Sequence, residues 1–164
     1  MKQTIFILMT IFLIVSSINA NKSKNIIYQT NTRSNYQLII NDVILRFSTG
    51  KYVSINELQN AIPMSQEEFW IYYSFSDPEK GELINKSFSK IDLLIIKYAK
   101  KNRGLFLKLY LQLSPFVDGE YAEGYYVDVE SIIENNKSLF CRIYESLNSD
   151  SKAKLKEYKE QYCK

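Results

Sequence analysis

The sequence predicts an all-α protein, and three observations support this class. Apolar residues recur at intervals of three and four along most of the chain, which is the period of a helix packed on one side. Helix-starting motifs precede several of these segments, while runs that alternate as strands do are scarce. We therefore expect a single compact domain over residues 34–164, built from about seven to eight short helices.

The first elements of this domain carry clear start and stop signals. Residues 36–47 hold apolar side chains at helical spacing, and Gly50 ends that segment. Residues 54–57 and 65–68 are two capping boxes, in which serine and glutamate side chains satisfy the free N–H groups of a helix start. Pro63 separates the two predicted helices.

The longest amphipathic segments follow Pro78. A strong helix is predicted from about Phe88 to Asn102, and Gly104 ends it. Residues 105–113 fit both helix and strand spacing, and we favour helix because leucine and lysine prefer it. From Phe88 onward the helices form antiparallel-looking pairs. This arrangement allows a solenoid-like stack in the C-terminal half, although no fixed sequence period supports one.

The C-terminal part is predicted to hold three helices. Asp118 caps a long one, which the pair Asn135-Asn136 ends. Apolar spacing over residues 139–147 predicts the next helix. Ser149 or Ser151 is expected to cap the last helix.

The residues before this domain have the layout of a secretory signal peptide (1–20). A positive start, a short apolar run and a stretch of small or polar residues follow one another. The apolar run is about half the ~20 residues that a membrane-spanning helix needs. We expect cleavage after Ala20, with Ser17 as the alternative position, and a flexible polar lead-in over residues 21–33. The mature protein would then be periplasmic or extracellular.

The two cysteines, Cys141 and Cys163, fit an oxidising destination. An even cysteine count in an exported chain favours a disulfide. The bond would close a loop of about 22 residues and stabilise the fold by roughly 3 kcal/mol. The alternative is a buried free Cys141 with Cys163 on a frayed tail.

The chain has no histidine, and this absence removes several classes of chemistry. Ser-His-Asp and Cys-His catalysis both need an imidazole, which is also the commonest metal ligand. Two cysteines are too few for a cysteine-rich zinc site, and no glycine-rich phosphate loop is present. We expect no cofactor. A net charge of +3 gives no general indication of nucleic-acid binding.

An acidic stretch follows Pro115, with six carboxylates between residues 118 and 134 and no lysine or arginine. Tyrosines accompany these acids, and tyrosine with polar neighbours is favoured at contact surfaces. The predicted partner surface comprises Asp118, Glu120, Tyr121, Glu123, Tyr125, Tyr126, Asp128 and Glu130. The simpler interpretation is a solvated helix face.

The same carboxylates offer the one remaining route to catalysis. A glycosidase needs two carboxylates that face each other across a cleft. Glu123 and Asp128 are five residues apart on a predicted helix, so they point well away from each other. An envelope polysaccharide hydrolase is therefore the runner-up hypothesis.

A basic stretch covers residues 86–108, where Asp92 is the only acid. Lys90, Lys97 and Lys101 share one face of the predicted helix. They predict contact with an anionic surface, such as lipid head groups, cell-wall polymer or an acidic protein. The alternatives are a solubilising face, or lysines that pair with the acidic stretch on an adjacent helix.

The leading functional hypothesis is binding. The sequence assembles no catalytic set, and its charges are segregated along the chain. We expect a small exported protein that acts on an unknown protein partner outside the cytoplasm, as an inhibitor or immunity-type protein, and not as an enzyme.

Three Asn-Lys-Ser sequons, at Asn21, Asn85 and Asn136, would matter only in a eukaryotic secretory pathway.

Overall fold

The computed structural model describes residues 35–101 and 103–163. The chain divides into two compact units, Met1–Tyr36 and Gln37–Lys164. In the described residues every regular element is a helix, which confirms the predicted all-α class. The predicted signal peptide and lead-in lie outside the described residues.

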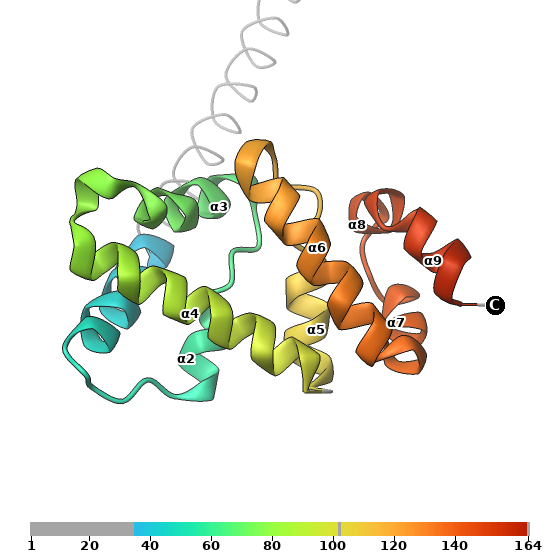
Figure 1. The fold of residues 1–164 in the computed structure, drawn as a ribbon, viewed down its shortest axis with the longest axis horizontal. Coiled ribbons are helices and arrows are strands. Elements are labelled where there is room, and N and C mark those ends of the chain that lie inside the picture. Colours follow the sequence, from blue (N-terminus) through green and yellow to red (C-terminus); the bar gives the residue numbers. More distant parts are fainter. Residues whose placement is uncertain (1–34, 102, 164) are drawn as a thin grey trace, which may run out of the picture. The chain divides into compact units, whose positions relative to one another are not determined.

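Short helices joined by short connections make up the second unit (Figure 1). Residues 35–48 are helical. The elements that follow are α2 (Ile55–Asn60), α3 (Gln66–Tyr73), the 3-10 turns η1 (Ser74–Ser76) and η2 (Pro78–Lys80), α4 (Glu82–Lys100), α5 (Gly104–Leu111), α6 (Gly119–Asn135), α7 (Lys137–Tyr144), α8 (Ser149–Lys154) and α9 (Lys156–Tyr162).

Serine caps set the starts of α2 and α3. Ser54 and Glu57 form the predicted capping box, because each side chain accepts a hydrogen bond from the other residue's N–H. At α3, the Ser65 hydroxyl accepts from the N–H of Glu68 at 3.2 Å. The Glu68 carboxylate, however, accepts from the N–H of Met64 at 2.7 Å. In the second predicted capping box, the glutamate therefore accepts from the residue before Ser65 instead of from the N–H of Ser65 itself.

Helix α4 begins earlier than Phe88, the predicted start. Gly81 precedes it with φ of 91°, a backbone angle that favours glycine, and marks the start of the helix. Asn85 in the first turns donates its side-chain amide to the carbonyl oxygen of Ser76. This hydrogen bond ties the start of α4 to η1, and spacing analysis of apolar residues does not detect it.

Four helices pack as two stacked pairs. Helix α4 contacts α5, α6 contacts α7, α4 also contacts α6, and α5 also contacts α7. Contacts within each pair and between like members of neighbouring pairs occur both in a short helical solenoid and in a four-helix bundle. The ambiguous segment 105–113 is helical through Leu111, as favoured, with Phe106, Leu107 and Tyr110 buried. The predicted pairing of neighbouring helices is therefore present, and it places α4 beside α6 (Figure 1).

The last predicted helix is two helices. Asn148, and neither Ser149 nor Ser151, caps α8, because its side chain accepts from the N–H of Ser151 at 2.8 Å. Leu155 then separates α8 from α9 and is fully buried. A buried leucine at this break anchors both short helices on the core.

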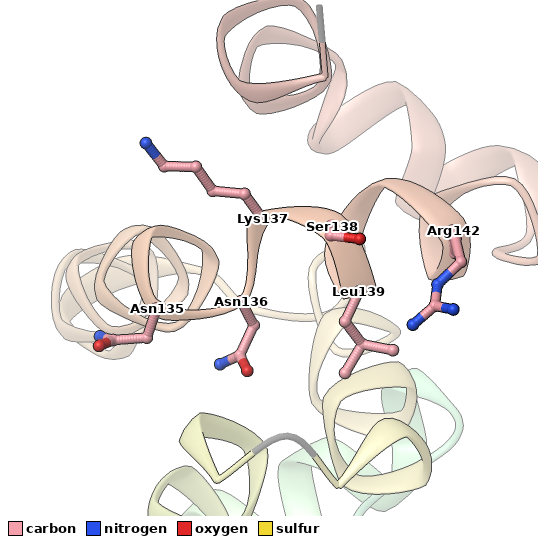
Figure 2. Close-up of a pocket in the computed structure, with 6 residues that line it drawn as sticks. All are labelled: Asn135, Asn136, Lys137, Ser138, Leu139 and Arg142. Carbon is pink, nitrogen blue, oxygen red and sulfur yellow. The ribbon is translucent and has the colours of Figure 1, made fainter.

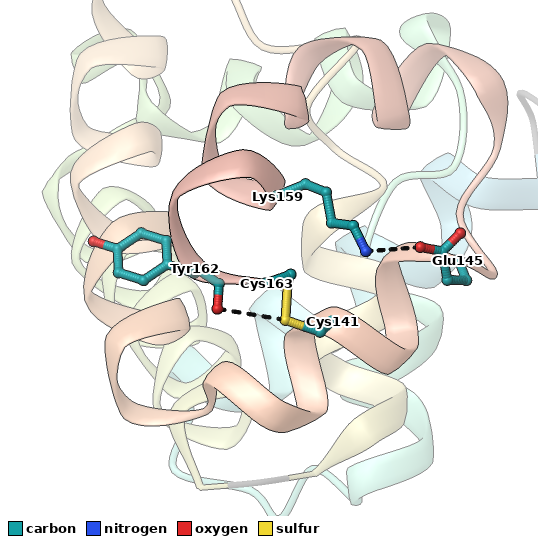
Figure 3. Close-up of a disulfide and its surroundings, with 5 residues drawn as sticks. All are labelled: Cys141, Glu145, Lys159, Tyr162 and Cys163. Carbon is teal, nitrogen blue, oxygen red and sulfur yellow. Dashed lines mark hydrogen bonds and ion pairs between the residues drawn. A yellow bond between two sulfur atoms is a disulfide. The ribbon is translucent and has the colours of Figure 1, made fainter.

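Cys141 and Cys163 form the predicted disulfide. The bond connects α7 with the residue that follows α9, and the two Cα atoms are 5.6 Å apart (Figure 3). The Lys159 ammonium lies 2.9 Å from the Glu145 carboxylate and joins the same two helices. The C-terminal segment is thus fastened to α7 and is not a frayed tail. Within the described ranges, no helix combines the length and the apolar content needed to cross a membrane.

Candidate functional site

Helix α6 has a buried side and an acidic outward side. Tyr125, Val129, Ile132 and Ile133 are buried, at the spacing of one helix face. The outward positions carry acids with an exposed valine among them. These exposed residues are Glu120, Glu123, Val127, Glu130 and Glu134. Val127 has 68% of its surface exposed, so an apolar side chain stands in the middle of an acidic face.

Tyr125 does not belong to the predicted partner surface. It is 2% exposed, and its hydroxyl donates to the carbonyl oxygen of Tyr110 at 2.9 Å. Sequence alone misplaced it because a tyrosine suits both a contact surface and a half-polar core position. The spacing of Tyr125 with Val129 and Ile132 was the signal that could have placed it inward.

The other two tyrosines of that surface are half-buried. The Tyr121 hydroxyl donates to Asp92 Oδ1 at 3.0 Å, and the Tyr126 hydroxyl to the carbonyl oxygen of Ser114 at 3.4 Å. Asp128 is also half-buried and lies 3.6 Å from the Lys100 ammonium. These three side chains make contacts within the protein and contribute little to an exposed surface. The acids left exposed are Asp118, Glu120, Glu123 and Glu130.

A carboxylate that sequence analysis did not select, Asp92, lies among tyrosines. Its Oδ1 accepts from the Tyr72 hydroxyl at 2.7 Å as well as from Tyr121. Burial raises the pKa of Asp92, the two hydroxyl bonds oppose that rise, and the charge of Asp128 adds to it. Loss of hydration, followed by the charge of Asp92, raises the pKa of Tyr121 well above its usual value. The cluster joins α3, α4 and α6.

The outward side of α4 carries the predicted lysines and a pocket. Lys90, Lys97 and Lys101 are exposed, and no salt bridge joins them to any described residue. A pocket of about 350 Å³ lies on this surface. It is lined by Phe47, Lys90, Leu93, Leu94 and Lys97.

Two of the three predicted lysines therefore meet at one apolar pocket. Leu93 has 63% of its surface exposed, and Leu83, at the start of α4, has 61% exposed. Lys101 follows the end of α4 and does not line the pocket. Sequence spacing found the lysines but not the pocket, because Phe47 reaches it from the separate helix at residues 35–48. We call this surface, formed by those five lining residues, the α4 pocket.

A second pocket lies where α6 meets α7 (Figure 2). It has a volume of about 260 Å³. Its lining residues are Asn135, Asn136, Lys137, Ser138, Leu139 and Arg142. Figure 2 shows the Lys137 side chain directed away from those of Asn136 and Leu139. Its ammonium lies over the Tyr162 ring, 5.3 Å from the centroid. The polar groups do not converge on one point, as they do in a specific ligand site.

Two of the sequons use their amides inside the fold. Asn136 donates to the carbonyl oxygens of Lys100 at 2.9 Å and of Ile132 at 3.1 Å. Asn85 donates to that of Ser76. A glycan attached to either amide nitrogen would displace these hydrogen bonds, so neither asparagine is free for glycosylation in this fold. Asn21 lies outside the described residues.

In the part of the chain that the structure describes, no group of three or more cysteine and carboxylate side chains could hold a metal ion. Of the two carboxylates weighed for hydrolysis, Glu123 is exposed and Asp128 is half-buried beside Lys100. The hydrolase hypothesis gains no support from these positions and stays a prediction that an activity assay would test.

Comparisons of this chain with protein families, with curated proteins and with solved structures found no match. The fold and surfaces define an all-α protein with one basic, pocketed helix face and one acidic helix face.

Proposed function

We propose that this protein acts by binding a protein partner, and that the α4 pocket is the contact site. The observation that carries the proposal is an apolar pocket flanked by two lysines, Lys90 and Lys97, that have no ion pair with any described residue. Protein interfaces commonly combine an apolar centre with a polar, solvent-accessible rim. The chemistry of the site therefore calls for an apolar side chain with carboxylates on either side.

The shape of this surface favours a protein over a membrane. A helix that lies on a bilayer presents a continuous apolar face and keeps its lysines at the sides. On α4 the exposed Leu83 and Leu93 are separated by lysines on the same side of the helix. The apolar surface is a shallow pocket that Phe47 also lines from a separate helix, so it is not the continuous face of one helix.

We also propose that the protein works outside the cytoplasm. The sequence pattern of residues 1–20 supports export. The Cys141–Cys163 disulfide is compatible with an oxidising compartment. Binding of a partner there would fit an inhibitor or immunity-type protein, by analogy alone.

Affinity capture tests the binding site. The mature protein serves as bait in a membrane-free envelope extract of the native host, beside the double reversal Lys90→Glu with Lys97→Glu. The matched control is Lys80→Glu with Lys154→Glu, which makes the same charge change at exposed residues that do not line the α4 pocket. We expect a partner to be retained by the wild type and the control but not by the reversal.

Equal retention by all three baits would refute the assignment to the α4 pocket. Flotation with anionic vesicles gives an independent comparison with the membrane alternative. Salt-sensitive vesicle binding that disappears in the Lys90→Glu, Lys97→Glu protein, without any captured partner, would favour lipid over protein.

A further inference from the structure

We propose that the α4 pocket receives the acidic face of α6 from a second copy of this chain, with Val127 inserted in the pocket. The inference rests on the binding role proposed for the α4 pocket and names the partner. The protein would then associate with itself through two different surfaces.

Val127 has the surroundings that the pocket calls for. It is 68% exposed, and no other described large hydrophobic side chain is more exposed except Tyr52. Glu123 precedes it by one helical turn and Glu130 follows it by one, on the same side of α6. Both glutamates are exposed, and neither is in a salt bridge with a described residue. The Tyr162 hydroxyl donates to Glu130 at 3.4 Å.

The α4 pocket presents the opposite arrangement. Leu93 and Leu94 line its apolar part, Lys90 lies one turn before them, and Lys97 lies one turn after them. An apolar pocket between two lysines therefore matches an apolar side chain between two glutamates.

The residue intervals agree when the two helices run antiparallel. From Lys97 to Leu93 is four residues, as from Glu123 to Val127, and from Leu93 to Lys90 is three, as from Val127 to Glu130. With Val127 at Leu93, this register therefore places Lys97 opposite Glu123 and Lys90 opposite Glu130. A parallel alignment with Val127 at Leu94, which also lines the pocket, gives the same intervals and places Lys90 opposite Glu123 and Lys97 opposite Glu130. The charges therefore match the two faces in either direction.

The two faces do not satisfy each other within one copy. Helices α4 and α6 pack together through their buried sides, and Lys100 with Asp128 is the ion pair between them among the described residues. The outward faces remain available to another molecule. Because the contact joins two different surfaces, each copy keeps one free face after pairing, so association can continue beyond a dimer.

Sedimentation velocity of the mature protein at low and high salt tests the inference. We expect concentration-dependent association that weakens as salt screens the lysine and glutamate pairs. Reversal of the lysines (Lys90→Glu with Lys97→Glu) or of the glutamates (Glu123→Lys with Glu130→Lys) should weaken association at least ~10-fold, because each puts like charges opposite each other. The control protein with Lys80→Glu and Lys154→Glu should associate as the wild type does.

An equimolar mixture of the two reversed proteins provides the decisive comparison. In the mixture, the unaltered acidic face of the first protein can meet the unaltered α4 pocket of the second, and the two reversed faces also carry opposite charges. We expect the mixture to associate while each reversed protein alone does not. A wild type that stays monomeric at every concentration and salt level would overturn the inference, as would a mixture that stays monomeric.

This outcome is separable from that of the proposed function. A monomeric wild type that still captures a host protein through Lys90 and Lys97 would refute self-association and leave the binding site intact. Self-association that is insensitive to Lys90→Glu and Lys97→Glu would refute the inference, and the capture experiment would still decide the proposed function.

Discussion

The hydroxyl of Tyr121 donates a hydrogen bond to Asp92 Oδ1 over 3.0 Å, which ties the middle of α4 to the start of α6. Tyr72 of α3 donates to the same oxygen at 2.7 Å. A carboxylate therefore joins three helices and helps to hold the two charged faces in place. The same arrangement makes the stability of the fold depend on the charge of Asp92.

The first prediction concerns the pH dependence of stability. Burial raises the pKa of Asp92 above its ordinary value of 3.8, so the folded state binds this proton more tightly than the unfolded chain does. The ionised form is then disfavoured by folding, and stability is lost as pH rises from about 3.8 through the raised pKa. Asp92→Asn removes this pH dependence of stability, since the asparagine side-chain oxygen accepts from tyrosine without carrying a charge.

The measurement is urea unfolding of wild type and Asp92→Asn across the acidic range. The stability of the wild type relative to the variant should be highest at low pH and should fall toward neutral pH. A difference that stays flat, or one that rises with pH, would contradict the burial of this carboxylate.

The second prediction concerns Tyr125. Tyr125→Phe removes a hydroxyl that donates to the Tyr110 carbonyl inside the core, at 2.9 Å. We expect a loss of about 1 kcal/mol, because one buried hydrogen bond is lost while the Tyr110 carbonyl oxygen keeps the N–H of Leu113 as a donor. Tyr52→Phe is the matched control at 80% exposure and should change the free energy of unfolding very little. Equal losses of unfolding free energy in the two variants would contradict the burial of the Tyr125 hydroxyl.

The third prediction concerns the connection between α6 and α7. Asn136→Ala removes two hydrogen bonds from a half-buried amide, one of which reaches Lys100 at the end of α4. We expect a loss of about 1–2 kcal/mol in urea unfolding. Asn135→Ala, the neighbouring exposed position, should cost less than about 0.5 kcal/mol. The reverse order of the two effects would contradict the described contacts of Asn136.

The fourth prediction concerns the disulfide. The Cys141–Cys163 bond closes a segment with a sequence separation of 22 residues. Replacing both cysteines by serine should lower the free energy of unfolding by roughly 3 kcal/mol, mainly by freeing the unfolded chain. Intact mass of the oxidised protein should be two hydrogens below that of the reduced form. Two free thiols in the exported protein would show that the bond is absent.

Much of the fold was predictable from local sequence, because helix spacing and caps are local properties. Ser54 with Glu57 marked the start of α2, and the leucines of residues 105–113 marked α5. The start of α4 was placed too late because a distant contact, Asn85 to Ser76, holds its first turns. The break at Leu155 was missed because burial of that side chain depends on tertiary packing.

The candidate site was predictable in part. Lysine spacing placed Lys90 and Lys97 on one face of α4, but the pocket between them needs Phe47 from a separate helix. The acidic face of α6 was also found, whereas Tyr125 was assigned to it wrongly. Asp92 was counted as the single acid in a basic stretch, and only its tyrosine partners on α3 and α6 reveal its role.

The central claim is that the α4 pocket binds a protein, and site-specific photocrosslinking tests it most directly. A photoreactive amino acid replaces Leu93, whose side chain lines the pocket and is 63% exposed, and cells are irradiated before extraction. We predict one defined adduct that disappears when Lys90→Glu and Lys97→Glu are added, and none from the same amino acid at exposed Ala153. An adduct of twice the chain mass would identify a second copy as the partner. No adduct from position 93, or equal adducts from positions 93 and 153, would contradict the account.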